Sequence, residues 1–485
     1  MSTPLKNRFS ASPAKWIRCS IWALITILFS IWTRSGWWLL ALPFFLDLYV
    51  TRFFPWGFWK TSKNKAFKSV MDWVDAIVFA MVAVYIINIY FFQNYQIPSS
   101  SLEKSLLVGD FLFVSKVDFG PRVPNTPIAF PLAHHTLPIL NCKSYSDKPL
   151  WGYKRVPGLT HVKRNDIVVF NFPAGDTVPA NPKYSNPDFY SLCYIIAQQN
   201  NVTPDVAGQY IKSHPEEFGK LLFRPVDRRE NYVKRCIGLP GETIQIKDNV
   251  VYIDGKIIED QPGVQFNYFV QTKGSYITED QFRKLGISNE DRQLLAQNDY
   301  RVFALPFHKD ANGNMNPIYE FPATKEVVEQ LRKSPAIDTV FIETDVIGDN
   351  QEVGGLTYPL SPEIKWRRDH FGPLYIPKKG ATIALTHQNL LLYARVIHNY
   401  EGHRLEIRDG KAFIDGKMAT TYTFGMDYYW MMGDNRHNSA DSRAWGFVPE
   451  DHIVGKPLLV WLSLDKDRGW FDGKIRWKRF FKKAY

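Results

Sequence analysis

The feature that most constrains this chain is residues 73–92, an apolar segment whose polar side chains Asp75 and Asn88 lie near its ends. A helix of about 20 residues is long enough to cross the hydrocarbon core of a bilayer. The segment therefore predicts a transmembrane helix, and a buried helix of a soluble protein is the alternative. If the segment spans a membrane, the residues before it and after it lie on opposite sides.

Two shorter apolar runs precede this segment, at residues 17–32 and 37–54, and the polar residues 33–36 separate them. Each run is close to the lower limit of about 17 residues for a membrane-spanning helix. No Ala-x-Ala-like site follows the first run, which disfavours a cleaved signal peptide. We expect a hydrophobic helical hairpin, with an interfacial or re-entrant pair of helices as the alternative.

Basic residues set the expected orientation of these helices. Residues 1–18 and the loop 52–68 carry Lys and Arg but no acidic residue. Such loops mark the cytoplasmic side. Residues 1–68 should therefore comprise a cytoplasmic tail, the hairpin and a basic cytoplasmic loop, and residues 69–93 should cross outward. The formal net charge of +11 collects beside apolar runs and at the C-terminus, which favours an anionic membrane surface over nucleic acid.

The rest of the chain predicts mainly short strands. β-rich runs bounded by Gly, Pro or Asn occur at 111–116, 166–170 and 243–247. Within this first β-rich part, 94–258, a helical insert is expected at about 188–218. Thr203 followed by Pro204 is a typical cap and first residue of a helix.

Three further regions follow. Residues 259–370 are more polar and predict an inserted subdomain, with helices near 278–285 and 324–334. Residues 371–464 again predict β-strands. The tail, 465–485, alternates Trp and Phe with Lys and Arg. Binding of this tail to anionic headgroups and a merely solvated basic tail are both open interpretations.

The sequence also contains an internal repeat. Residues 234–256 resemble residues 394–417, and each copy follows a similar apolar strand candidate. We expect a duplicated β unit that ends in an Asp-Gly hairpin. Lys234 in the first copy corresponds to Ala394 in the second, which hints at a specific role for Lys234.

The four cysteines do not predict a disulfide framework or a metal site. Cys19 lies in an apolar run, and Cys142, Cys193 and Cys236 lack metal-ligand spacing. One disulfide among these three and reduced, buried thiols both remain open.

Candidate chemistry begins at three serines that directly follow Pro98. A serine hydroxyl needs a base to take its proton, and the histidines lie in loops without a Gly-x-Ser-x-Gly motif. A neutral lysine can serve instead, because burial can lower its reference pKa of about 10.4 by 3–5 units. Lys234 has the apolar neighbours Tyr232, Val233, Cys236 and Ile237, although an ordinary exposed lysine is the simpler interpretation.

A third stretch, 433–443 (GDNRHNSADSR), is densely polar. It does not fit a calcium loop, because Ser439 stands where Gly is needed and Trp445 where Glu is needed. It is either a solvated turn or a network of donors and acceptors that holds a lysine amine in place.

Three motifs in order carry a resemblance to type I signal peptidases (leader peptidases), membrane-anchored serine proteases with a Ser/Lys dyad. Residues 97–102 (IPSSSL) resemble the serine box of that family, 232–241 (YVKRCIGLPG) the lysine box, and 433–443 the final box. A further strand motif is matched by 164–170 (RNDIVVF). The matching regions are roughly 70–170, 230–258 and 371–464, and they leave out the helical insert and the inserted subdomain.

The resemblance implies roles for individual residues. Ser101 would be the nucleophile and Lys234 the general base. The Ser99 hydroxyl would join the Ser101 backbone N–H in the oxyanion hole, and Ser439 would orient the lysine amine. Asp441 and Arg443 would form a structural ion pair behind the site.

The resemblance also implies a substrate and a fold. Small, apolar pockets for an Ala-x-Ala substrate would be lined by Ile97, Leu102, Leu106, Tyr232 and Val233. The fold would be mostly β, an open, barrel-like antiparallel sheet with a β-rich cap and α/β insertions. The enzyme would lie in a bacterial-type inner membrane with its catalytic domain on the periplasmic side. Its partners would be exported preproteins, the lipid bilayer and the secretion translocon, and it would need no metal or organic cofactor.

The sequence departs from the family pattern in three places. Leu102 replaces the usual methionine, which conserves volume. Glu103 and Lys104 replace a Met/Pro-rich pair and put two charges near the expected rim of the site. Three apolar runs exceed the one or two spans usual in the family.

Other functional classes remain as alternatives. A catalytically silent scaffold or binding module of a secretion system should have lost Ser or Lys, but both are present. A self-cleaving repressor should carry a helix-turn-helix domain in place of the apolar runs. A basic membrane-surface binding protein would leave the three ordered motifs without explanation.

Overall fold

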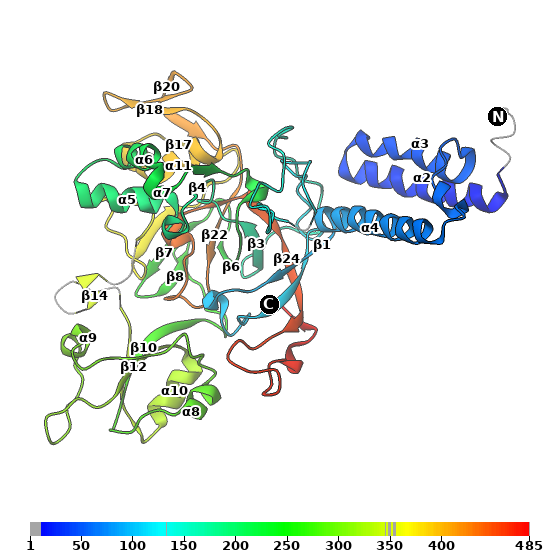
Figure 1. The fold of residues 1–485 in the computed structure, drawn as a ribbon. Coiled ribbons are helices and arrows are strands. Elements are labelled where there is room, and N and C mark those ends of the chain that lie inside the picture. Colours follow the sequence, from blue (N-terminus) through cyan, green and yellow to red (C-terminus); the bar gives the residue numbers. More distant parts are fainter. Residues whose placement is uncertain (1–10, 132, 345, 348–350, 353–355, 485) are drawn as a thin grey trace. The chain divides into compact units, whose positions relative to one another are not determined.

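A computed structural model describes residues 11–131, 133–344, 346–347, 351–352 and 356–484 (Figure 1). The chain forms two compact units: Met1–Gln93 with Lys116–Thr160, and Asn94–Ser115 with His161–Tyr485. They are called here the helical unit and the β unit.

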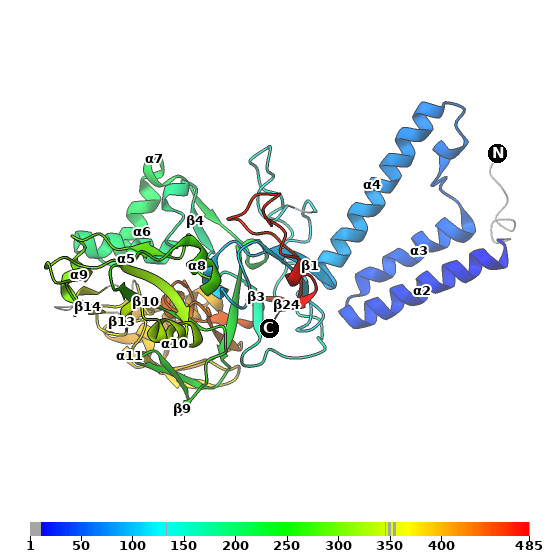
Figure 2. The ribbon, with the colours of Figure 1, turned by 90° about the horizontal axis from the view of Figure 1, so that it is seen from below.

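The helical unit contains the apolar N-terminal segments. Its elements are α2 (Pro13–Thr33), η1 (Gly36–Leu40), α3 (Ala41–Leu46), η2 (Asp47–Thr51), η3 (Phe58–Thr61) and α4 (Lys65–Tyr90). α2 and α3 run side by side (Figure 2). Aromatic rings of Phe29, Trp38 and Tyr90 join α2, η1 and α4, with centroids 4.8–5.7 Å apart.

Two of these helices, α2 and α4, are long and apolar enough to cross a membrane. They overlap the first apolar run, 17–32, and the segment predicted as a span, 69–93; the outward direction is still a prediction. The second run is helical over Gly36–Thr51 but shorter than a spanning helix. The Asn64 side chain caps α4 by accepting hydrogen bonds from the N–H groups of Ala66 and Phe67. Residues 117–160 of this unit are mostly irregular.

The β unit is built on an 8-stranded sheet, and the expectation of a mostly β fold with an open, barrel-like sheet is confirmed. Its strand order is β1 (Phe92–Gln96), β2 (Asp110–Ser115), β24 (Ile453–Ser463), β3 (Ile167–Asn171), β6 (Asn231–Gly238), β22 (Tyr428–Met432) and β23 (Val448–Pro449), with β25 (Lys482–Lys483) paired to β24. β3 lies inside the sheet, and all five of its residues are buried, the apolar Ile167–Phe170 and the polar Asn171.

A second β layer covers one part of this sheet. It contains β16 (Phe371–Tyr375), β7 (Thr243–Lys247), β8 (Val250–Ile253) and β9 (Lys256–Ile257), then the hairpins β17 (Thr382–Ala384) with β21 (Thr421–Thr423) and β18 (Leu405–Arg408) with β19 (Lys411–Ile414) and β20 (Lys417–Ala419). Its core includes Trp430, Phe371, Leu374 and Ile244, all fully buried.

The two regions predicted as insertions each contain secondary structure of their own. The helical insert comprises α5 (Phe189–Asn200), α6 (Pro204–Ser213) and α7 (Pro215–Phe218), flanked by β4 (Thr177–Pro179) and β5 (Leu221–Phe223). Thr203 caps α6 and Pro204 is its first residue, as predicted.

The inserted subdomain has its own sheet, in the order β11 (Gln293–Leu294), β12 (Ile318–Thr324), β10 (Gln265–Thr272) and β13 (Ile337–Ile342). It also contains α8 (Glu279–Leu285), α9 (Tyr300–Ala304) and α10 (Lys325–Lys333), and a short hairpin, β14 (Val346–Ile347) with β15 (Gln351–Glu352), follows. Thr278 and Thr324 cap α8 and α10 at the predicted positions. Phe321 and Val270 are fully buried in a core separate from that of the large sheet.

The predicted repeat is only partly correct. Both copies end in hairpins with left-handed Asp-Gly turns, at Asp254-Gly255 and Asp415-Gly416. However, Lys234 lies on strand β6, whereas Ala394 lies in helix α11 (His387–Arg395). Thr386 caps α11, and Leu390 and Tyr393 bury one face of it, so the 3.6-residue period prevails over the strand prediction. The comparison of Lys234 with Ala394 therefore carries no information.

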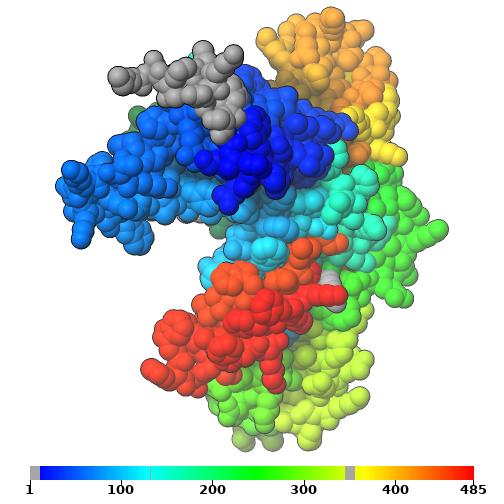
Figure 3. All heavy atoms as spheres, turned by 90° about the vertical axis from the view of Figure 1, so that its right-hand side faces the viewer, coloured from blue at the N-terminus to red at the C-terminus, as the bar shows by residue number. Residues whose placement is uncertain are grey.

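The C-terminal tail is part of the fold. β25 pairs with β24, and the Arg479 guanidinium binds the buried carboxylate of Asp110 at 2.5 Å. Trp470, Phe471 and Trp477 nevertheless remain largely exposed. Figure 3 shows this segment, in red, at the molecular surface.

All four cysteines lie in the described part of the chain, and none of them forms a disulfide. Cys19, Cys193 and Cys236 are buried, and Cys142 is exposed.

Candidate active site

The serine segment lies at the start of the β unit, in the connection between β1 and β2. Ser99 is extended, and Ser101 lies in the short turn η4 (Ser100–Leu102). Two backbone hydrogen bonds, from Ile97 N–H to Asp110 O and from Gly109 N–H to Ile97 O, close the base of the connection. The serine is thus held by the paired strands rather than by a free loop.

Lys234 projects from β6 onto this turn. Its Nζ lies 2.5 Å from Ser101 Oγ, which is within hydrogen-bond distance. Only 5% of Lys234 and 7% of Ser101 is exposed. The structure therefore brings together the two residues that the sequence placed 133 positions apart.

The environment of Lys234 favours a neutral amine. Burial lowers the pKa of Lys234 to about 8, with Arg443 acting in the same direction and Asp441 opposing it. A neutral amine has a lone pair and can accept a proton from a hydroxyl, whereas an ammonium cannot. A substantial neutral fraction at pH 8 makes Lys234 chemically competent as a base.

Residues 433–443, named here the catalytic loop, follow β22 and end in α12 (Ser442–Trp445). The Asn435 N–H donates to Ser101 O at 3.1 Å, and the Asn435 side chain donates to Ser100 O at 3.3 Å. A Cβ on Gly433 would lie 2.6 Å from Ser101 O and 2.3 Å from Ser439 Oγ. Only glycine lets the loop approach the serine turn this closely.

Ser439 lies beside Gly433, next to the Ser101 backbone. Its Oγ is buried and has no hydrogen-bond partner among the described residues. A bond from Ser439 to the Lys234 amine is therefore still a prediction. Ser99 is exposed, and its Oγ lies 3.4 Å from Ser101 Oγ on the open side of the turn.

Asp441 and Arg443 form a buried ion pair with N–O distances of 2.7 and 2.9 Å. Asp441 also accepts the Gly433 N–H at 3.0 Å, and Arg443 donates to Arg436 O at 2.6 Å. Burial by itself would raise the pKa of Asp441, but Arg443 and the Gly433 N–H hold it below the ordinary value. The pair closes the catalytic loop on itself.

The predicted pocket residues lie around this site. Ile97, Leu102 and Leu106 are buried in one apolar cluster, and Val233 packs against it. The Tyr232 ring stacks on Phe172 at 4.5 Å and meets the edge of Trp445 at 5.4 Å.

Sequence reasoning missed Phe172 and Trp445 in this group. Trp445 was considered only as a mismatch to a calcium loop, and no spacing pattern links Phe172 to Tyr232.

Sequence reasoning also missed a second buried ion pair. Arg235, the neighbour of Lys234, contacts the Asp434 carboxylate at 2.6 Å, and Ser105 Oγ donates to the same carboxylate at 2.5 Å. These bonds join β6, the serine segment and the catalytic loop. Both charged residues lie within the recognised motifs, but nothing in the sequence pairs them.

Glu103 and Lys104 were expected at the rim of the site. Both are half-buried, and the Lys104 amine donates to the carbonyl oxygens of Leu285 and Gly286 in the inserted subdomain. Burial and the nearby Asp291 raise the pKa of Glu103 to about 7. The pair thus faces the inserted subdomain.

Comparison with known proteins identifies the family of the chain. Residues 70–306 and 394–462 match the family described as "Signal peptidase, peptidase S26". The match includes the helical insert and part of the inserted subdomain, which the short motifs had left uncovered.

The signal peptidase I of Buchnera aphidicola from Acyrthosiphon pisum is 23% identical over 426 residues, covering 86% of this chain and 82% of the relative. The signal peptidase I of Buchnera aphidicola from Baizongia pistaciae is 20% identical over 425 residues, covering 88% and 87%. That of Haemophilus influenzae is 51% identical over 67 residues, covering 14% and 19%. The chain therefore belongs to the signal peptidase family, peptidase S26.

Proposed function

We propose that the protein is a membrane-bound serine endopeptidase that removes signal peptides from exported preproteins with a Ser/Lys dyad. The observation that carries this proposal is the 2.5 Å contact between Lys234 Nζ and Ser101 Oγ in a buried setting that lowers the lysine pKa. This contact puts the base within reach of the proton that it must remove.

In the proposed reaction, Ser101 Oγ attacks the scissile carbonyl carbon while Lys234 takes the hydroxyl proton. Lys234 then returns that proton to the leaving amine, and the C–N bond breaks. Water, deprotonated by Lys234, attacks the acyl carbon, the ester C–O bond to Ser101 breaks, and Lys234 returns the proton to Ser101 Oγ. No step needs a metal or an organic cofactor.

Other residues around the dyad have supporting roles. The exposed Ser99 hydroxyl and the Ser101 N–H would stabilise the oxyanion. Ser439, whose buried hydroxyl is otherwise without a partner among the described residues, would turn toward the Lys234 amine. The buried Asp441–Arg443 pair would keep the catalytic loop in shape.

The surroundings of the dyad support a substrate with small apolar residues before the cut. Ile97, Leu102, Leu106 and Val233 offer no charge to a substrate side chain, and Tyr232 adds an aromatic ring that stacks on Phe172. This chemistry fits an Ala-x-Ala site. The acid-free loops before α4 support a multi-pass arrangement in an inner membrane, with the β unit on the periplasmic side and the translocon as a further partner.

A catalytically silent scaffold of a secretion system is the competing function. The intact contact between Ser101 and Lys234 favours the enzyme, because a scaffold has no need of a buried lysine that costs folding free energy.

Cleavage of a preprotein by the detergent-solubilised protein tests the proposal. Wild type should cut once, directly after the Ala-x-Ala sequence, as read from the N-terminal sequence of the product. Ser101→Ala should not cut, and Ser100→Ala serves as its matched control on the adjacent serine. Cleavage that persists in Ser101→Ala would exclude Ser101 as the nucleophile, and a silent wild type on several preproteins would favour the scaffold.

A further inference from the structure

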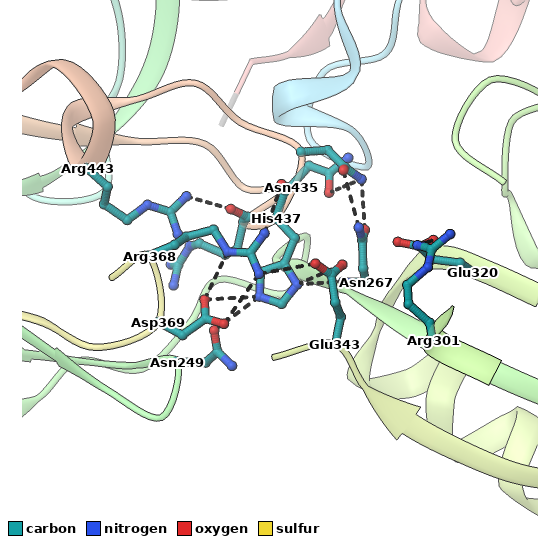
Figure 4. A network of polar contacts seen from close by, with 12 residues as sticks. Asn249, Asn267, Arg301, Glu320, Glu343, Arg368, Asp369, Asn435, His437 and Arg443 are labelled. Carbon is teal, nitrogen blue, oxygen red and sulfur yellow. Dashed lines mark hydrogen bonds and ion pairs between the residues drawn. The ribbon is translucent and has the colours of Figure 1, made fainter. Parts of the chain in front are cut away.

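We propose that His437 is a positioning residue through which the inserted subdomain holds the catalytic loop against the serine turn. The inference rests on the proposed function, and it gives the inserted subdomain a task in the reaction. Its basis is a buried cluster of polar contacts on both sides of the His437 ring (Figure 4).

The first strand of the inserted subdomain runs directly beside the catalytic loop. Gln265 of β10 donates its N–H to Asp434 O and accepts the Arg436 N–H, both at 2.9 Å, as in a parallel bridge. Farther along, the Asn438 side chain donates to Asn267 Oδ1 at 2.8 Å. The middle of the loop is thus joined to β10 by one isolated parallel bridge and by side-chain hydrogen bonds.

His437 completes this contact with its side chain, which is fully buried. The Asn267 backbone N–H donates to Nδ1 at 3.3 Å. On the other side of the ring, Nε2 lies 3.2 Å from Asn249 Oδ1 and 3.3 Å from Asp369 Oδ1. The ring therefore bridges β10, the turn between β7 and β8, and the segment before β16.

Charged groups surround the ring. Glu343, directly after β13, places Oε2 3.7 Å from Nδ1, and this oxygen is buried without a hydrogen-bond partner among the described residues. Arg368 contacts Glu343 at 3.3 Å and Asp369 at 3.1 Å. Burial would raise the pKa values of both carboxyl groups, but His437 and Arg368 hold them below their ordinary values.

The His437 ring can hold the catalytic loop to the inserted subdomain whether the imidazole is neutral or protonated. With Nδ1 accepting from Asn267, the proton is on Nε2 and points to Asp369 and Asn249. In the imidazolium form, Nδ1–H would instead face the unpaired Glu343 oxygen. Both states tie the loop to the inserted subdomain, so the anchor is a fixed one.

The loop transmits this anchoring to the dyad. Asn435, two residues before His437, donates its N–H to Ser101 O, and Ser439, two residues after it, lies beside Gly433. Loss of the His437 side-chain contacts would make the residues between Asn435 and Ser439 more mobile. Ser101 and Lys234 would then lose their alignment while the pocket residues on β6 stayed in place.

The test compares His437→Ala, His437→Asn and wild type in preprotein cleavage, because the Asn side-chain oxygen can accept the Asn267 N–H in place of Nδ1. His437→Ala should lower kcat ten- to hundredfold, the cost of a misplacement of roughly 1 Å, and leave KM within about twofold. The acidic limb of its pH profile should move above 8, because a loosened loop admits water to Lys234. His437→Asn should recover at least part of the lost kcat.

The matched control is Glu320→Gln. It breaks the ion pair with Arg301 in the same subdomain, on the far side of Asn267 from the ring (Figure 4). Its kcat and pH profile should equal those of wild type. Equal kcat and an unchanged pH profile in His437→Ala would overturn the inference, and so would an equal loss of kcat in Glu320→Gln.

Hydrogen exchange separates this inference from the proposed function. His437→Ala should accelerate exchange of the Asp434–Ser439 amides relative to wild type and Glu320→Gln, whether or not the protein cleaves the chosen preprotein. Unchanged exchange there would refute the anchoring role. A wild type without activity would instead refute the proposed function, and the exchange result would still decide whether His437 anchors the loop.

Discussion

Replacing Gly433 by alanine should abolish most activity while leaving the fold intact. A Cβ at this position would lie 2.3 Å from Ser439 Oγ and 2.6 Å from the backbone oxygen of Ser101. The serine side chain can rotate away, but the Ser101 carbonyl is fixed by its bond from Asn435 N–H and cannot. The catalytic loop or the serine turn must therefore shift.

The size of the effect follows from this clash. Ordinary van der Waals contact needs roughly 3.5–4 Å, so the backbone must separate by about 1 Å. A displacement of this size between reacting groups costs about a hundredfold in rate, and overpacking of a buried site costs about 1–3 kcal/mol of stability. We expect kcat for preprotein cleavage to fall about a hundredfold and the melting temperature to fall by only a few degrees.

Gly469→Ala is the control, because a Cβ there meets open space and neither glycine has a positive φ. Single-turnover cleavage and thermal unfolding in detergent should be measured on both variants. A Gly433→Ala protein with wild-type kcat would show that the loop and the serine turn are not held in contact. An equal loss in Gly469→Ala would show that the effect is not local.

Two further predictions concern buried charge. Because the pKa of Lys234 falls from 10.5 in the unfolded chain to about 8 in the fold, the unfolded state binds the extra proton between these values, and stability rises with pH across that window. Lys234→Met should therefore stabilise the protein by up to about 3 kcal/mol at pH 7 and by less as pH approaches 10.5. Thermal unfolding of wild type and variant at several pH values checks this. A variant less stable than wild type at pH 7 would contradict it. Asp434→Asn should lower the free energy of unfolding by about 3–5 kcal/mol, because it leaves the buried Arg235 charge unpaired. The control is Asp409→Asn, which lies in an exposed turn. Equal melting temperatures of the two variants would exclude the effect.

The sequence predicted those parts of the fold that local chemistry decides. β3 follows from an uninterrupted β-branched and aromatic run, α6 begins at its predicted Thr cap, and α8 and α10 lie where helices were expected. Helix α11 was misread as a strand, because a short apolar run fits either period until its cap and its packing partners are known. The run 37–54 was likewise expected to be helical throughout, whereas its helical part ends at Thr51 and is shorter than a spanning helix.

The candidate site divides in the same way. Ser101 and Lys234 were found because short motifs mark them, and their contact was then observed at 2.5 Å. The Arg235–Asp434 pair and the contacts of His437 with Asp369 and Glu343 could not be found, because they join segments that are distant in the sequence and have no spacing signature. Their partners depend on how the inserted subdomain folds back onto the catalytic loop.

The most direct test of the central claim, that a neutral Lys234 activates Ser101, is the pH dependence of kcat/KM for preprotein cleavage between about pH 6 and 10. The account predicts an acidic limb with an apparent pKa near 8, set by the buried lysine, and no cleavage at any pH in Lys234→Met. Wild-type cleavage rates in Lys234→Met, or an unchanged acidic limb in that variant, would contradict it and assign the proton to another base.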